Sequence, residues 1–126
     1  MMALMGVGMF DFGRYGLLHT RAYNAARAGT QYGIQNQGTA DDFSGMVDAA
    51  RTDACDDNDE LAIDARRYCM CPRTSTETVC TGTCADGIFV PIFVAVTVRD
   101  TLDLLFTYPG IADTLQIASR SEMRVR

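Results

Sequence analysis

The chain of 126 residues is long enough for one domain, and 48% of its residues are apolar, so a single core can be buried. Its formal net charge is −5, and all 11 basic residues are arginines. An acidic chain without a basic stripe argues against binding to nucleic acid. The lack of lysine also excludes Schiff-base catalysis.

The first segment, residues 1–36, is predicted to be one long helix. Residues 1–10 are apolar and carry no charge, but a span across a bilayer needs about 20 such residues. A signal peptide would have a basic residue before its apolar segment, and none precedes these residues. The segment therefore looks like the second half of a membrane helix. Arg14, Arg21 and Arg27 follow where that helix would leave the bilayer.

Small residues recur along this predicted helix at steps of three and four, which places them on one face. Two interpretations of the stripe are open. It packs against the protein's own sheet, or it lets neighbouring helices approach closely, as small residues do in membranes. In a filament both hold, at different ends of the helix. The candidate assembly positions are Phe12, Gly13, Arg14, Ala22, Ala25, Ala26 and Gly29.

Residues 37–126 are predicted to be a globular α+β domain with an antiparallel sheet, against which the long helix packs. A short helix comes first, and alternating β-branched and apolar residues then indicate strands. Pro91 limits pairing near the start of the strongest strand. The expected elements are a helix over 41–54, strands over 61–67, 76–80, 88–99 and 115–125, and an apolar run over 101–108.

Four of the five cysteines lie close together, at Cys69, Cys71, Cys80 and Cys84. This density is high for a reduced cytosolic protein and predicts two disulfides across a hairpin. The nested pairing, Cys71 with Cys80 and Cys69 with Cys84, is the expected one. The crossed pairing, Cys69 with Cys80 and Cys71 with Cys84, is the close alternative, and spacing does not decide between them. Each closed loop should add about 2–3 kcal/mol.

A four-cysteine zinc site is the competing interpretation of this cluster. Zinc sites usually bring C-x2-C pairs, and the C-x-C and C-x3-C spacings here depart from that pattern. Cys55 is left over, and can be free, paired in another scheme or linked to a second subunit. A catalytic thiol is not expected, because the only histidine, His19, lies in the membrane-proximal helix.

An acidic segment follows the short helix and is a weak calcium candidate. The main interpretation is a solvated loop, because its spacing does not match the EF-hand pattern. No other metal site, no nucleotide-binding loop and no catalytic motif is indicated, so neither an enzyme nor a cofactor is expected. The calcium candidates are Asp56, Asp57, Asp59 and Glu60.

Several short motifs occur in a definite order. Phe-Asp-Phe-Gly-Arg stands at 10–14, followed by Asn-Ala-Ala-Arg-Ala-Gly at 24–29 and Tyr-Gly at 32–33. Tyr-Cys-Met-Cys-Pro at 68–72 then precedes Cys-Thr-Gly-Thr-Cys at 80–84. Each motif is weak alone, and their order and gaps make the set more specific.

The end of the chain continues the pattern, with Val-Ala-Val-Thr-Val at 94–98, Leu-Leu-Phe at 104–106, Tyr-Pro-Gly at 108–110 and Met-Arg-Val at 123–125. Together the motifs resemble the TadE-like family of the tight-adherence pilus system. Members carry an apolar helix, an acidic-Phe-Gly-Arg step, a C-x-C-Pro and C-x3-C block, a proline turn and a final strand. The resemblance covers nearly the whole chain.

The resemblance implies a minor pilin or pseudopilin of the inner membrane, processed by a prepilin peptidase. Its globular part would face the periplasm or lie outside the cell in a pilus, and its partners would be other pilin subunits. The family's basic leader, cleavage site and nearby glutamate do not precede Met1. Two explanations are open: the sequence begins partway along the family's helix, or its start was assigned too late.

Three functions follow from these observations. The first is a structural pilus subunit, held by packing and disulfides. The second is an exported adhesin-like binding module that uses the acidic loop or aromatic side chains. The third and most remote is a cytosolic zinc-binding regulator. The candidate aromatic residues of the second are Tyr68, Phe89, Phe93 and Tyr108.

Overall fold

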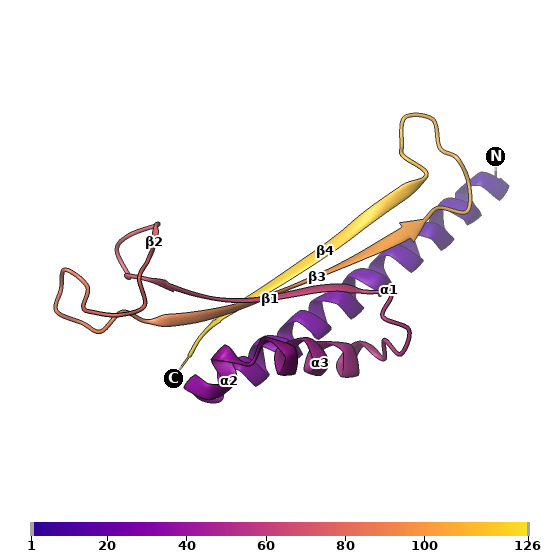
Figure 1. Ribbon diagram of the computed structural model, residues 1–126. Coiled ribbons are helices and arrows are strands. Elements are labelled where there is room, and N and C mark those ends of the chain that lie inside the picture. Colours follow the sequence, from indigo (N-terminus) through magenta and orange to yellow (C-terminus); the bar gives the residue numbers. More distant parts are fainter. Residues whose placement is uncertain (1, 126) are drawn as a thin grey trace.

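The computed structural model describes residues 2–125 as an α+β fold, in which helices cover one face of an antiparallel sheet (Figure 1). The arrangement is pilin-like, and it confirms the predicted fold class. The elements are α1 (Met2–Gly33), α2 (Gln37–Asp41), α3 (Phe43–Ala54), β1 (Ala62–Met70), β2 (Glu77–Thr78), β3 (Ile92–Asp103) and β4 (Thr114–Arg124).

The sheet has the strand order β2-β1-β3-β4, and every neighbouring pair is antiparallel. β3 begins at Ile92, later than predicted, because Pro91 has no N–H to donate to a neighbouring strand. It also ends later, at Asp103, which pairs with Thr114 of β4. The central strand is therefore long, and both β1 and β4 align along it.

The apolar run predicted over 101–108 is divided between two elements. Residues 101–103 complete β3, and the rest opens the connection that we call the β3–β4 loop (residues 104–113). This loop lies at the end of the sheet nearest the N-terminus, as Figure 1 shows. At the opposite end, the strand predicted over 76–80 is reduced to the two residues of β2.

The C-terminal half of α1 packs closely on the sheet because its inward side chains are small. Ala25 and Ala26 are fully buried. A Cβ added to Gly29 would lie 2.9 Å from the Met46 carbonyl oxygen and 3.1 Å from both methyl groups of Val96. The sheet and α3 therefore touch the backbone of α1, and a larger residue would force the layers apart.

One hydrophobic core lies between α1, α3 and the inner face of the sheet. The alternation of β3 turns three valines to the helices, and each large side chain buried there contributes about 1.5–3 kcal/mol. Leu61, which directly precedes β1, is also part of this core. The largest fully buried side chains are Met46, Leu61, Leu102, Ile117, Val94, Val96 and Val98.

The short helix predicted over 41–54 corresponds to α3, and a separate one-turn helix, α2, precedes it; polar caps begin both. The Asn36 side chain accepts from the Thr39 N–H at 2.9 Å and begins α2. Asp42 then caps α3 by accepting from the Gly45 N–H at 3.0 Å, and it accepts from the Tyr32 hydroxyl at 2.8 Å. The Gly45 bond, followed by the Tyr32 bond, lowers the pKa of Asp42, and the same contact with Asp42 raises the pKa of Tyr32.

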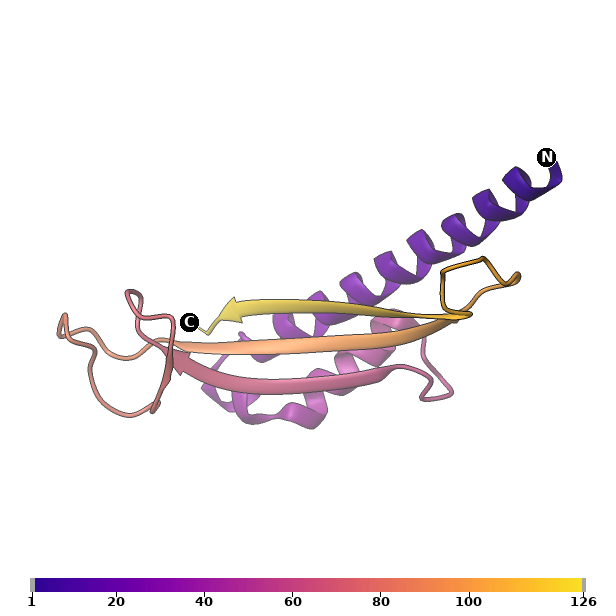
Figure 2. The ribbon, with the colours of Figure 1, turned by 90° about the horizontal axis from the view of Figure 1, so that it is seen from above.

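The N-terminal half of α1 leaves the globular part of the molecule. Figure 2 shows the helix running past the edge of the sheet, beside the β3–β4 loop, with its first turns free of any other element. The second half of α1 belongs to the core, so the predicted helix over 1–36 and the predicted globular part over 37–126 share one hydrophobic core. Met1 and Arg126 lie outside the described residues.

Candidate functional site

The first half of α1 is an apolar helix that the chain itself does not cover. We call residues 2–20 the apolar arm. Met2 is 91% exposed, Met9 80% and Phe12 76%. Soluble monomers rarely leave a contiguous apolar patch open to water, so the arm is a candidate interaction surface. Its exposed large apolar side chains are Met2, Leu4, Met5, Met9, Phe10, Phe12, Tyr15 and Leu17.

Glycines on the arm leave its backbone open to a neighbour. A Cβ added to Gly6, Gly13 or Gly16 would have no contact within 4 Å. Gly13 and the adjacent Phe12, both predicted assembly residues, are exposed. The arm therefore presents large apolar side chains beside bare backbone, a surface suited to close helix packing.

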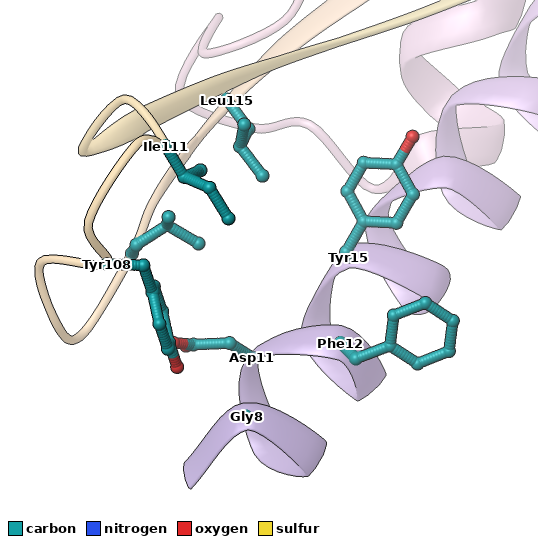
Figure 3. Close-up of a pocket in the computed structure, with 8 residues that line it drawn as sticks. Gly8, Asp11, Phe12, Tyr15, Tyr108, Ile111 and Leu115 are labelled. Carbon is teal, nitrogen blue, oxygen red and sulfur yellow. The ribbon is translucent and has the colours of Figure 1, made fainter. Parts of the chain in front are cut away.

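Asp11 is the one buried residue of the arm, and it ties the arm to the β3–β4 loop. The Tyr108 hydroxyl donates to the Asp11 carboxylate at 3.1 Å, and Figure 3 shows the two side chains reaching toward each other. Arg14 lies 3.8 Å from the other Asp11 oxygen and donates to the Asp103 carbonyl at 3.4 Å. Desolvation, followed by the contact with Asp11, raises the pKa of Tyr108.

From the sequence alone, Asp11 is expected only to interrupt the apolar run, and no contact is predicted for it. The available signal was a lone acidic residue within an apolar helical stretch, because such a group is buried only with a polar partner. The partner lies 97 positions away along the chain, so no local pattern indicates it.

A pocket of about 370 Å³ lies between the arm and the β3–β4 loop. Ile111 and Leu115 face the helix across it, as Figure 3 shows. Its walls are apolar apart from the oxygens of Asp11 and the tyrosines, so it suits an apolar side chain better than a polar ligand. The lining residues are Gly8, Asp11, Phe12, Tyr15, Leu104, Tyr108, Ile111 and Leu115.

The remaining predicted assembly residues lie in the core. Ala22, Ala25, Ala26 and Gly29 are buried against the sheet and α3 of their own chain. They are therefore not available to a neighbouring subunit, and the first interpretation of the small-residue stripe applies to this half of α1. Of the small-residue stripe, only the part on the arm is exposed to a neighbouring helix.

The segment that holds four cysteines, the cysteine hairpin (residues 69–84), contains two disulfides, Cys69–Cys80 and Cys71–Cys84. This is the crossed pairing, so the nested pairing expected from the sequence is wrong. The strand register explains the difference: Cys69 lies opposite Thr78, which brings Cys80, two residues further, to a Cα–Cα distance of 5.2 Å from Cys69. Cys71 lies beyond the end of β1 and meets Cys84 at 5.8 Å.

The disulfides also decide between the two interpretations of the cluster. All four sulfurs are bonded in pairs, so the zinc interpretation is wrong. Two disulfides in a small domain indicate an oxidising location outside the cytoplasm. Cys55 is a free, exposed thiol, and it ends α3 in a left-handed backbone conformation with φ 53°.

The acidic loop (residues 53–60) does not bring its carboxylates together in one site. Asp56 is buried and accepts from the N–H groups of Glu60 at 3.0 Å and Leu61 at 3.2 Å, which directs the chain into β1. Asp59 forms an ion pair with an arginine of α3. Across residues 2–125, no three His, Cys, Asp or Glu side chains form a group that could hold a metal ion. The geometry therefore gives the calcium interpretation no support.

The four aromatic candidates of a binding module occupy three separate places. Tyr68 and Phe93 stack on the outer face of the sheet, with ring centroids 5.5 Å apart. Phe89 is exposed in the disulfide-linked hairpin, and Tyr108 contacts Asp11 near the arm. They do not form one aromatic binding site.

In the part of the chain that the structure describes, no helix is long and apolar enough to cross a membrane. Comparisons with protein-family models, with curated proteins and with solved structures gave no match to this chain.

Proposed function

We propose that the chain is a structural subunit, a minor pilin or pseudopilin of the TadE-like type, in a bacterial surface pilus or its assembly machinery. The observation that carries the proposal is the apolar arm. The same helix is buried in its second half and leaves eight large apolar side chains of its first half exposed. Water disfavours such a surface, so it requires an apolar partner.

The contacts at the base of the arm support this function. Tyr108 connects the arm to the β3–β4 loop through Asp11, and Arg14 connects it to Asp103 at the end of β3. They hold the projecting helix at one angle to the sheet, and a fixed angle is what regular assembly needs. The pocket beside them would accept an apolar side chain of a neighbouring helix.

The proposal also assigns the two ends of the molecule to different surroundings. The arm packs against the helices of other pilin subunits, and enters the apolar layer of the inner membrane before assembly. The sheet domain faces the periplasm, or lies outside the cell in the pilus. Its two disulfides suit that environment, since they form and persist where conditions are oxidising.

The test compares two triple variants in the producing bacterium. Met5, Met9 and Leu17 are replaced by serine in the first variant. Their side chains are 77%, 80% and 75% exposed. The matched control replaces three exposed apolar residues of the hairpin by serine. These are Val79, Ile88 and Phe89.

We expect the arm variant to fold with nearly unchanged thermal stability, because its altered side chains contact nothing in the core. Its amount in cross-linked oligomers and in sheared surface fibres should fall at least about tenfold, since apolar contacts carry most association energy. The control should assemble like the natural protein. Normal assembly of the arm variant, or equal loss in both variants, would contradict the proposed role of the arm.

A further inference from the structure

The β3–β4 loop is a second apolar segment beside the arm, and it comes from a distant part of the sequence. Residues 104–112 contain no charged side chain, although the protein is acidic as a whole. Leu105, Phe106 and Ile111 are each more than half exposed. The loop therefore presents three large apolar side chains to water, and such a cluster marks an interaction surface.

The loop and the arm form one continuous surface. The Tyr108 hydroxyl donates to Asp11 at 3.1 Å, and side chains of both segments line the pocket between them. Figures 1 and 2 place the loop at the same end of the molecule as the first turns of the arm. A partner that surrounds the arm therefore also meets the loop.

The connection between β1 and β3 (residues 71–91), at the other end of the sheet, provides a contrast. It also exposes large apolar side chains, but charged residues are interspersed among them. These charged residues are Arg73, Glu77 and Asp86. Single apolar side chains among charges are ordinary on a protein surface, whereas an uncharged apolar loop beside an apolar helix is not.

The charges nearest to the loop lie together at its base. Asp103 and Asp113 border the uncharged run, and the Leu104 N–H donates to the Asp113 carbonyl at 2.8 Å. Arg14 of the arm donates to the Asp103 carbonyl at 3.4 Å, so the three charged residues lie at one level. Uncharged segments above a common level of charge, with Tyr108 at their junction, follow the order of groups at a lipid surface. A protein partner would require no such common level.

We propose that the β3–β4 loop enters the membrane surface beside the arm, as a second and shallower anchor. This inference rests on the proposed entry of the arm into the inner membrane. Leu105, Phe106 and Ile111 would lie among the acyl chains, and the irregular backbone would stay at the level of the headgroups, where water satisfies its polar groups. Two anchors fix the direction in which the sheet domain leaves the membrane, whereas a single helix can rotate about its axis.

Apolar contact, and not charge, drives the proposed binding. The net charge is −5, and the acidic loop lies at the same end of the sheet, because β1 begins opposite the last part of β3. Anionic headgroups would therefore repel this end of the molecule. The appropriate probe is a vesicle of phosphatidylcholine, which has no net charge, and binding to it should change little with added salt.

The experiment uses tryptophan fluorescence, since the natural chain has no tryptophan and one substitution supplies a single reporter. The full chain is placed in phosphatidylcholine vesicles as three variants. Phe106→Trp reports on the loop, Phe10→Trp on the arm, and Phe89→Trp on the β1–β3 connection as the matched control. All three phenylalanines are exposed. Bromine on the acyl chains quenches any tryptophan that reaches them.

We expect Phe106→Trp to lose at least about half of its emission in brominated vesicles, and to emit at shorter wavelength, because its ring would lie among acyl chains. Bromine near the headgroups should quench it best, whereas bromine near the ends of the acyl chains should quench Phe10→Trp best. Phe89→Trp should emit as it does without vesicles. This order would support an anchor that is shallower than the arm.

Three results would overturn the proposal, and they differ in what they mean for the arm. Quenching of Phe10→Trp alone would show that the loop stays in water, and the proposed pilin function would be unaffected. A wavelength shift of Phe106→Trp without quenching would show that a second protein chain covers the loop. If neither variant is quenched, the proposed membrane entry of the arm is wrong as well.

Discussion

The two halves of α1 are continuous in backbone and opposite in surroundings. Residues 2–20, the apolar arm, carry large apolar side chains that project into solvent, whereas residues 21–33 carry small ones that lie against the sheet. Within a single chain, the less hydrophobic half is the buried one. Side-chain size explains this, because only alanine and glycine let the helix approach the sheet and α3 so closely.

This contrast separates two properties of the molecule. The packed half of α1 contributes to the free energy of unfolding, whereas we propose that the arm contributes to association. Substitutions in the two halves should therefore change different measurements. The following predictions test that separation, beginning with the largest expected effect.

Replacing Gly29 by leucine should lower the free energy of unfolding by about 3 kcal/mol or more, since the new side chain would collide with Met46 and Val96. Chemical denaturation measures the change. The matched control is Gly13→Leu on the arm, where the added side chain meets open space and leaves the stability nearly unchanged. Equal destabilisation by both substitutions would contradict the division of the helix.

Removing the disulfide between Cys69 and Cys80 by serine substitution should lower the stability by about 2–3 kcal/mol, because the unfolded chain regains the freedom of a short loop. The hairpin lies at the opposite end of the sheet from the arm, as Figure 2 shows, so association through the arm should persist. Peptide mapping without reduction provides the check on connectivity. A linked pair of Cys69 and Cys84 would show that the crossed pairing is wrong.

The cap of α3 should give the molecule an acid-sensitive contribution to stability. The pKa of Asp42 is lowered in the folded state, so its stabilisation is complete above the ordinary aspartate pKa and is lost as pH falls through the lower folded value. Asp42→Asn should remove this part of the pH dependence and lower Tm by a few degrees, since an amide caps nearly as well. Melting curves between pH 2 and pH 7, roughly the range in which aspartate titrates, measure it. Identical curves for both proteins would contradict the assignment.

The smallest effect is expected at the base of the arm. Tyr108→Phe removes the hydroxyl that donates to Asp11 and leaves the ring in place. Global stability should change little, while hydrogen exchange of the β3–β4 loop (104–113) should become faster. The pKa of Tyr108 is raised, so the natural protein should keep this contact below about pH 10 and lose it as pH rises above that value. Unchanged exchange in the variant would show that the contact does not hold the loop.

Local patterns in the sequence were sufficient for much of the architecture. Three- and four-residue steps indicate α1, alternation indicates the strands, and Pro91 indicates limited pairing near the start of the strongest strand. The cysteine spacing indicated two disulfides. These features depend on neighbours within a few residues, so they can be read along the chain.

Tertiary structure alone decided which half of α1 is buried, how the cysteines pair and what Asp11 contacts. Asp11 and Tyr108 are far apart in sequence, and each disulfide joins cysteines on two segments of the hairpin. Their proximity depends on strand register and on how closely a helix can approach a sheet. Those quantities are set by packing among distant segments, which a periodicity in one segment cannot encode.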